Sequence, residues 1–126
     1  MKEILAVVRM DKMNETKRAL ADAGVSSITA RDVLGRGKGL VDLQVLRGAE
    51  KGYEEAIEQL SQGGRLVPKR VLIMVVPDSL KDKVVKILIR VNQTGKSGDG
   101  VIFVSPCMDA VRIRTGEDGN SALDEA

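Results

Sequence analysis

Apolar residues in the first part of the chain form two patterns, a continuous run typical of a buried strand and a stripe with the spacing of an amphipathic helix. Residues 4–9 form a short β-branched run that predicts a strand. A stripe with helical spacing follows, made of Met13, Thr16, Lys17, Leu20 and Ala23. Asn14 or Asp11 stands where a helix cap is expected, and Gly24 where a helix usually ends. Residues 27–34 then predict a second strand.

The same order of elements returns about seventy residues later. Residues 71–76 predict a strand, residues 79–91 a helix and residues 101–105 another strand. The apolar stripe of this helix consists of Leu80, Val84, Ile87, Leu88 and Val91. Asp78 or Ser79 is placed to cap it. Two β-α-β units in tandem predict an α+β fold of the ferredoxin-like split β-α-β class, a four-stranded antiparallel sheet with two helices on one face.

The connection between the two units, residues 35–67, is far longer than the ~4 to 6 residues of a median connection. Within it, Tyr53, Ala56, Ile57 and Leu60 have helical spacing and predict a short amphipathic helix. Two interpretations of this stripe stay open, because it could pack on its own domain or dock on a partner. The second makes Tyr53, Ile57 and Leu60 candidate partner-binding residues.

Length and composition limit the classes of function. With 126 residues we expect one small domain, 1–126. Lys and Arg total 20 against 18 acidic residues, and the chain has one Tyr, one Phe and no Trp, so nucleic-acid binding is not expected. The absence of His argues against zinc sites, catalytic triads and histidine acid–base chemistry. The acids Asp99 and Glu117 are better explained by turns, so we do not expect an enzyme.

Two further features bear on the cellular setting. Cys107 is the only cysteine and has no histidine to activate it, which favours a structural thiol. No apolar run approaches ~20 residues, so membrane insertion is not expected. The chain opens with a short charged strand rather than a signal peptide, and we expect a cytoplasmic protein.

The segment 94–100, Thr-Gly-Lys-Ser-Gly-Asp-Gly, precedes a predicted strand and then the pair Arg112 and Arg114. Its glycines leave backbone N–H groups able to face an anion, and two arginines at i, i+2 on an extended segment project to one side. These residues are compatible with a phosphate site or with a tight turn and two solvated arginines. A Walker A loop would need its first glycine at Arg90, so a P-loop ATPase is not expected.

Three segments together resemble the PII family of signalling proteins. The stretch 94–117 is similar to the family's C-terminal signature, and residues 32–39, Asp-Val-Leu-Gly-Arg-Gly-Lys-Gly, resemble the start of its long T-loop. Residues 46–50, Leu-Arg-Gly-Ala-Glu, match a T-loop motif. The resemblance implies a trimer, which would cover the free face of the sheet, with a T-loop at about 36–66 and a flexible C-terminal tail at about 118–126.

The resemblance also implies a site for ATP or ADP in a cleft between neighbouring subunits. Its phosphates would lie near Gly98, Asp99, Gly100, Arg112 and Arg114. Other positions that match the family's nucleotide site are Val7, Thr29, Gly35, Gly37, Lys38 and Val75. Thr29 would lie near the base, and the two glycines near the phosphates. For Val7 and Val75 an ordinary strand role is equally open.

A second ligand is implied at Lys69, which matches the lysine that pairs with a carboxylate of 2-oxoglutarate in the family. The alternative is a solvated lysine at the entry to a strand. Lys38-Gly39-Leu40 stands where Arg-Gln-Lys is typical, so the glutamine that helps hold magnesium and 2-oxoglutarate has no clear equivalent. No metal-binding residue is therefore assigned.

Two charged family residues are replaced together. The phosphate-binding lysine is Val101 and a glutamate is Ile73. Because both charges are lost, no buried charge is left unpaired and the fold should tolerate the change. We expect the consequence in nucleotide affinity, in ATP versus ADP preference, or in a mixed oligomer that supplies the missing groups. Lys51 replaces the modified T-loop tyrosine, so uridylylation is not expected.

Within the family, the unusual T-loop and residues 91–95 most resemble the nitrogenase-associated NifI branch. This resemblance implies a homotrimer, or a hetero-oligomer with a sister PII protein, that inhibits nitrogenase until ATP and 2-oxoglutarate bind. The other interpretation is a PII regulator of an ammonium channel or of a nitrogen-assimilation enzyme.

Overall fold

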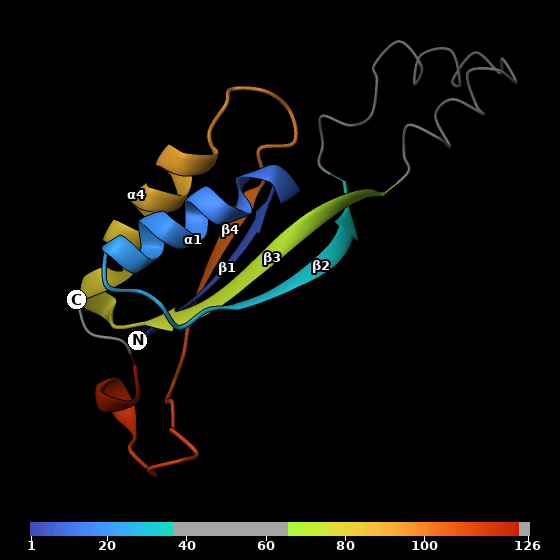
Figure 1. Ribbon diagram of the computed structural model, residues 1–126. Helices are drawn as coiled ribbons and strands as arrows, with labels where there is room; N and C mark the ends of the chain where they lie inside the picture. The colour runs from blue at the N-terminus through green and yellow to red at the C-terminus, as the bar shows by residue number, and fades with distance from the viewer. Residues whose placement is uncertain (37–65, 124–126) are drawn as a thin grey trace, which may run out of the picture.

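The computed structural model describes residues 1–36 and 66–123. In these ranges the order of elements is β1 (Lys2–Val8), α1 (Met13–Asp22), β2 (Thr29–Gly35), β3 (Val67–Val76), α4 (Asp78–Asn92) and β4 (Val101–Pro106) (Figure 1). Two short 3-10 helices, η1 (Met10–Lys12) and η3 (Gly119–Ala122), complete the list. The strands are antiparallel neighbours in the order β2-β3-β1-β4. This arrangement confirms the predicted ferredoxin-like fold.

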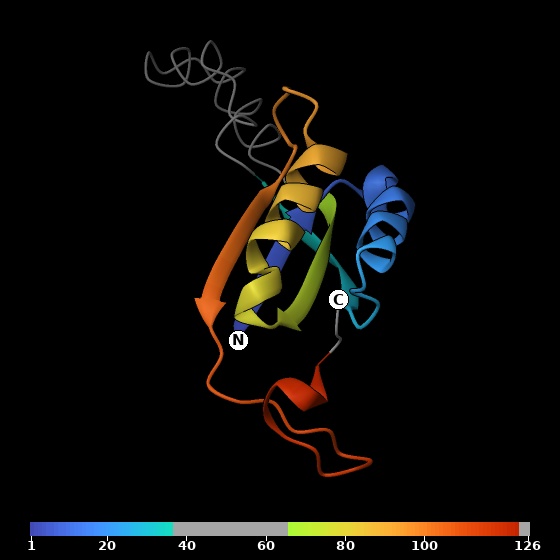
Figure 2. The ribbon, with the colours of Figure 1, turned by 90° about the vertical axis from the view of Figure 1, so that its left-hand side faces the viewer.

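The core lies between the sheet and the two helices, which are on the same side of it (Figure 2). Alternate strand residues face the helices, and in β1 these are Ile4, Ala6 and Val8, all buried. Leu20 of α1 and Leu88 of α4 pack into the same core. The predicted apolar runs and helical stripes therefore supply the core, except that Lys17 of the α1 stripe is exposed.

The helix starts differ from the prediction. α1 has no side-chain cap, because η1 runs directly into it and the backbone N–H of Met13 donates to the carbonyl of Met10. α4 follows Pro77, also without a side-chain cap. Asp78 instead binds the N-terminal amine at 3.2 Å and Lys2 at 3.5 Å, so the carboxylate is turned toward β1. The expected capping roles of Asp11, Asn14, Asp78 and Ser79 are wrong.

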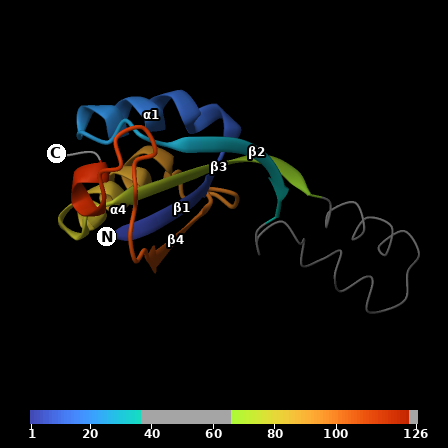
Figure 3. The same cartoon turned by 90° about the horizontal axis from the view of Figure 1, so that it is seen from below.

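β3 extends further than predicted. It begins at Val67, and its first residues pair only with β2, since the pairing with β1 starts where Arg70 meets Val8. β2 and β3 therefore project beyond the rest of the sheet as a two-stranded extension, visible at one end of the molecule (Figure 3). The sheet end that carries this extension is also where β1 ends and β4 begins.

The face of the sheet opposite the helices is covered by no element in the described ranges. The strand register places Val7, Val71 and Val101 in one row on this face, and Leu5, Ile73 and Phe103 in the next. Val101 is 46% exposed and Phe103 58% exposed. Val101 and Ile73, the two replaced family positions, thus both contribute apolar side chains to this face.

Candidate functional site

The segment that joins α4 to β4, residues 93–100, is called the glycine loop below. Asp99 organises its first half, because its carboxylate accepts the backbone N–H of Thr94 at 2.7 Å and that of Gly95 at 2.9 Å. The Thr94 hydroxyl also donates to it and is the main cause that lowers the pKa of Asp99 from 3.8 to about 2. Asp99 is therefore a turn-forming residue, as its sequence context indicates.

Two cations from the body of the domain hold the second half of the glycine loop. Arg9, just after β1, donates from Nη2 to the carbonyl of Ser97 at 2.6 Å and lies 3.3 Å from Asp99 Oδ1. Lys69, in β3, donates from Nζ to the carbonyl of Gly98 at 2.7 Å. The loop is thus fixed to two strands by contacts to its own backbone.

Gly100 is the point where the glycine loop enters β4. Its φ is +114°, and a Cβ built on it would lie 1.8 Å from the carbonyl oxygen of Val7. Any side chain there would overlap the backbone of β1. A glycine is needed at this position for packing alone, whether or not a ligand binds.

The glycine loop, the β2–β3 extension and the end of β1 enclose a cavity of about 520 Å³, called the loop pocket below. Six predicted ligand residues line it together: Val7, Gly35, Lys69, Gly98, Asp99 and Gly100. Arg36 and Lys96 line it as well and were not predicted, although both are basic residues inside the glycine-rich segments. Three cations and one carboxylate make the loop pocket electropositive.

Lys69 is the most unusual group in the loop pocket. It is only 8% exposed, so the alternative of a solvated lysine is wrong. Its Nζ carries three donors, and among residues 1–36 and 66–123 the carbonyl of Gly98 is the acceptor it has; no acidic side chain in those ranges forms an ion pair with it. A buried ammonium without a counter-charge is costly, and it favours an anionic ligand.

Four other predicted site residues belong to the start of β2, the end of β3 and the segment after β4, which lie at the end of the sheet opposite the glycine loop (Figure 1). Thr29 and Val75 line a separate hollow of about 360 Å³, which Ala122 and Leu123 also line. Arg112 donates from Nη2 to the carbonyl of Ala122 at 3.2 Å, and its Nη1 lies 3.9 Å from Glu117. These contacts place Arg112 beside that hollow and away from the glycine loop.

Arg114 is exposed in the turn that follows Arg112. A backbone bond from Gly116 N–H to the carbonyl of Arg112 closes this turn. One chain therefore does not bring the two arginines to the glycine loop, and a site with all of these residues needs two copies. Gly37, Lys38, Tyr53, Ile57 and Leu60 lie outside the described residues.

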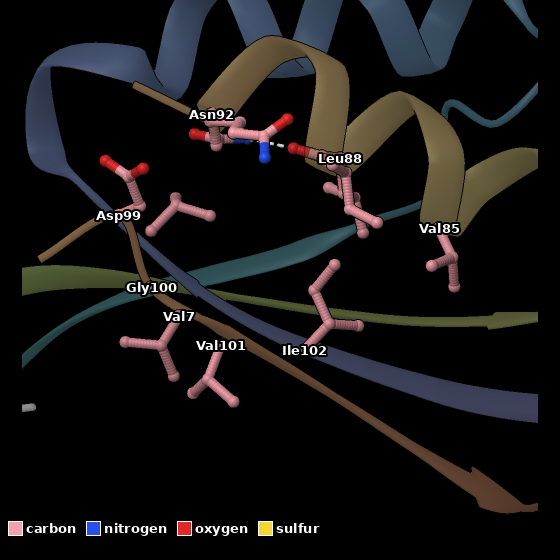
Figure 4. Close-up of a pocket in the computed structure, with 11 residues that line it drawn as sticks. Val7, Val85, Leu88, Asn92, Asp99, Gly100, Val101 and Ile102 are labelled. Atoms are coloured by element: carbon pink, nitrogen blue, oxygen red, sulfur yellow. Dashed lines mark hydrogen bonds between the residues drawn. The ribbon is translucent and has the colours of Figure 1, made fainter. Parts of the chain in front are cut away.

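A third hollow, of about 460 Å³, lies between α4 and β4 on the helix side of the sheet (Figure 4). Asn92 and Asp99 stand at one end, and Val85 and Ile102 form its apolar walls. Asp99 and Gly100 line both this hollow and the loop pocket, so the glycine loop separates the two. No pattern in the sequence predicts this hollow.

Neither a metal site nor a membrane-spanning helix is found in the part of the chain that the structure describes. No group of three metal-ligating acidic, Cys or His side chains occurs there. No helix within the same ranges has the length and apolar character needed to cross a membrane.

Comparison with known proteins adds to this geometry. The model of the family described as Nitrogen regulatory protein P-II matches residues 1–117. A "Nitrogen fixation nifHD region GlnB-like protein 2" of Methanobacterium ivanovii is 43% identical over 98% of this chain and 99% of its own. The protein of the same description from Methanococcus maripaludis is 42% identical over 98% of this chain and 100% of its own. A "Nitrogen regulatory protein P-II" of Haemophilus influenzae is 37% identical over 98% of this chain and 100% of its own.

Proposed function

We propose that this chain, which belongs to the nitrogen regulatory protein P-II family, binds ATP or ADP at the glycine loop and controls a target protein through residues 36–66. Its family and its nif-region relatives give it a role in nitrogen-regulatory signalling. Proteins of this family are regulators rather than enzymes, and we propose the same for this chain.

The observation that carries the proposal is Lys69, a buried cation in the loop pocket with no acidic partner in the described ranges. An anionic ligand would supply the missing charge. The nucleotide phosphates would bind the N–H groups of the glycine loop. A carboxylate of 2-oxoglutarate, with magnesium, would pair with Lys69.

The oligomer we propose is a homotrimer, or a hetero-oligomer with a sister PII protein. The face with Val101 and Phe103 exposed has an apolar character that favours burial against another copy. The two halves of the predicted nucleotide site, at opposite ends of β4, also need a second copy to meet. In that arrangement Thr29, Val75, Arg112 and Arg114 of one subunit would face the glycine loop of the next.

Nitrogenase is the target we propose first, because several relatives are named for the nitrogen-fixation nifHD region. The second candidate is an ammonium channel or a nitrogen-assimilation enzyme, since the relative from Haemophilus influenzae is described only as a P-II protein. Capture of nitrogenase by the purified chain, and its release by ATP with 2-oxoglutarate, would distinguish the two.

Calorimetric titration tests the ligand proposal. ATP and ADP should each release heat, and 2-oxoglutarate with Mg²⁺ should bind only after ATP is present. Lys69→Met should abolish the 2-oxoglutarate step, because it removes the buried charge. Lys86→Met, at an exposed lysine of α4 outside the loop pocket, is the matched control and should retain that step. A wild-type chain that binds neither nucleotide would contradict the proposal.

A further inference from the structure

We propose that Arg9 is a positioning residue for the anion site, acting with Lys69 to turn the N–H groups of Gly98 and Asp99 outward as a pair of donors. The inference rests on the proposed nucleotide site, and it adds a residue outside the loop pocket to it. Arg9 does not line that pocket, so its effect on a ligand is exerted through the glycine loop.

Arg9 and Lys69 set the direction of two consecutive peptide groups. In a trans peptide the carbonyl and the following N–H point in opposite directions. Arg9 binds the carbonyl of Ser97, so the N–H of Gly98 points away from Arg9. Lys69 binds the carbonyl of Gly98, so the N–H of Asp99 points away from Lys69. Both carbonyls are held by the body of the domain.

The N–H groups of Gly98 and Asp99 are the donors that this arrangement leaves for a ligand. Within residues 1–36 and 66–123 neither the N–H of Gly98 nor that of Asp99 has a hydrogen-bond acceptor. Gly98 has a φ of +92°, a left-handed conformation in which successive N–H groups can converge on one anion. A phosphate oxygen is an acceptor suited to such a pair.

Arg9 makes several contacts at once, and together they hold more of the glycine loop than any one of them could. The guanidinium of Arg9 reaches Asp99 Oδ1 from both Nε, at 3.4 Å, and Nη2, at 3.3 Å, while Nη2 also holds Ser97. Asp99 in turn holds Thr94 and Gly95 at the other end of the loop. Arg9 therefore joins both halves of the glycine loop to β1. A lysine has no planar fork and could keep only part of this set.

The test compares Arg9→Met with Arg90→Met, which removes the same charge from an exposed position on α4. Without ligand, the NMR amide signals of Gly95, Gly98 and Gly100 should shift or broaden in Arg9→Met, while signals from the helices and the melting temperature stay close to the wild type. With ATP, the Kd should rise about tenfold or more in Arg9→Met. The Kd of Arg9→Lys should lie between those of the wild type and Arg9→Met, and the Kd of Arg90→Met should match that of the wild type.

Wild-type ATP affinity in Arg9→Met, or unchanged loop signals in that variant, would overturn the inference while leaving the nucleotide site itself intact. A wild-type chain that binds neither ATP nor ADP would instead refute the nucleotide site, and the positioning role toward it as well. Arg9→Met and Arg90→Met losing affinity equally would show a general charge effect and would also overturn the inference.

Discussion

At the scale of single residues, the glycine loop shows that residue types typical of ligand sites also have structural roles. Asp99 matches the family's phosphate segment, yet its carboxylate is occupied by Thr94, Gly95 and Arg9. Gly100 is required by the backbone of β1. Lys69 differs, because it is buried and its ammonium has no acidic partner in the described ranges. It therefore indicates a ligand more directly than any glycine does.

Replacing Gly100 with alanine should destabilise the fold more than the same change at Gly116. Both residues have positive φ, +114° and +74°, so both variants carry backbone strain of roughly 1 kcal/mol or more. Only at Gly100 would the new Cβ overlap a backbone oxygen; at Gly116 nothing lies within 4 Å. Urea denaturation should give a loss for Gly100→Ala about 2 kcal/mol or more above that for Gly116→Ala. Equal losses would mean that the loop moves freely away from β1.

Acid should loosen the glycine loop through Asp99. The pKa of this carboxyl is lowered to about 2 in the fold from an ordinary 3.8, chiefly by the Thr94 hydroxyl. The stabilisation is therefore fully present above about pH 4 and is lost as the pH falls through about 2. The amide NMR signals of Thr94 and Gly95 should titrate with that low midpoint, and Asp99→Asn should remove the titration. A midpoint close to 3.8 in the wild type would contradict the hydrogen bonds described.

At the scale of elements, periodicity predicts which segments become strands and helices, but it does not predict their ends. The caps were wrong because η1 runs straight into α1, and because Asp78 binds the N-terminal amine. The start of β3 was missed because residues 67–70 include a proline and two cations, which is unusual for a buried strand. Their pairing with β2 and the burial of Lys69 come from tertiary contacts.

The same limit applies to the site. The glycine loop could be found because its residues are adjacent in the sequence, but Arg9 could not, since its acceptors lie 88 and 90 positions away. The sequence does predict a strand between Gly98 and Arg112, but it does not show which other residues lie at the far end of that strand, because the place of β4 in the sheet is set by its pairing with β1.

The junction between α4 and the glycine loop is held by a buried polar contact. Asn92 donates from Nδ2 to the Thr16 hydroxyl of α1 at 3.2 Å and to the carbonyl of Leu88 at 3.0 Å. Asn92→Ala should lower the free energy of unfolding by about 1 to 3 kcal/mol, since both bonds are lost in a buried place. Gln93→Ala, an exposed amide one residue on, should change it by no more than about 0.5 kcal/mol. Similar losses in urea denaturation would show that the contact between the helices contributes little.

At the scale of the whole molecule, the structure separates two sets of predicted ligand residues. The loop pocket holds the glycine loop and Lys69, whereas Thr29, Val75 and Arg112 surround the hollow at the other end of the sheet. If the proposed nucleotide site is correct, a single chain presents two halves of it. The exposed apolar face between them gives a physical reason for copies to associate, and in the proposed trimer each copy would complete its neighbour.

Mixing two defective variants tests this arrangement. Gly98→Asp places a carboxylate in the glycine loop and should repel phosphate, and the double variant Arg112→Ala with Arg114→Ala should weaken nucleotide binding through lost charged hydrogen bonds. Each variant alone should bind ATP poorly while forming the same oligomer by light scattering. If sites lie between copies, unfolding and refolding the two together at equal amounts should restore about a quarter of the wild-type sites, because that fraction of interfaces pairs an intact loop with intact arginines. If each site lay within one chain, every chain in the mixture would carry a damaged half, and ATP titration would recover no tight sites at all.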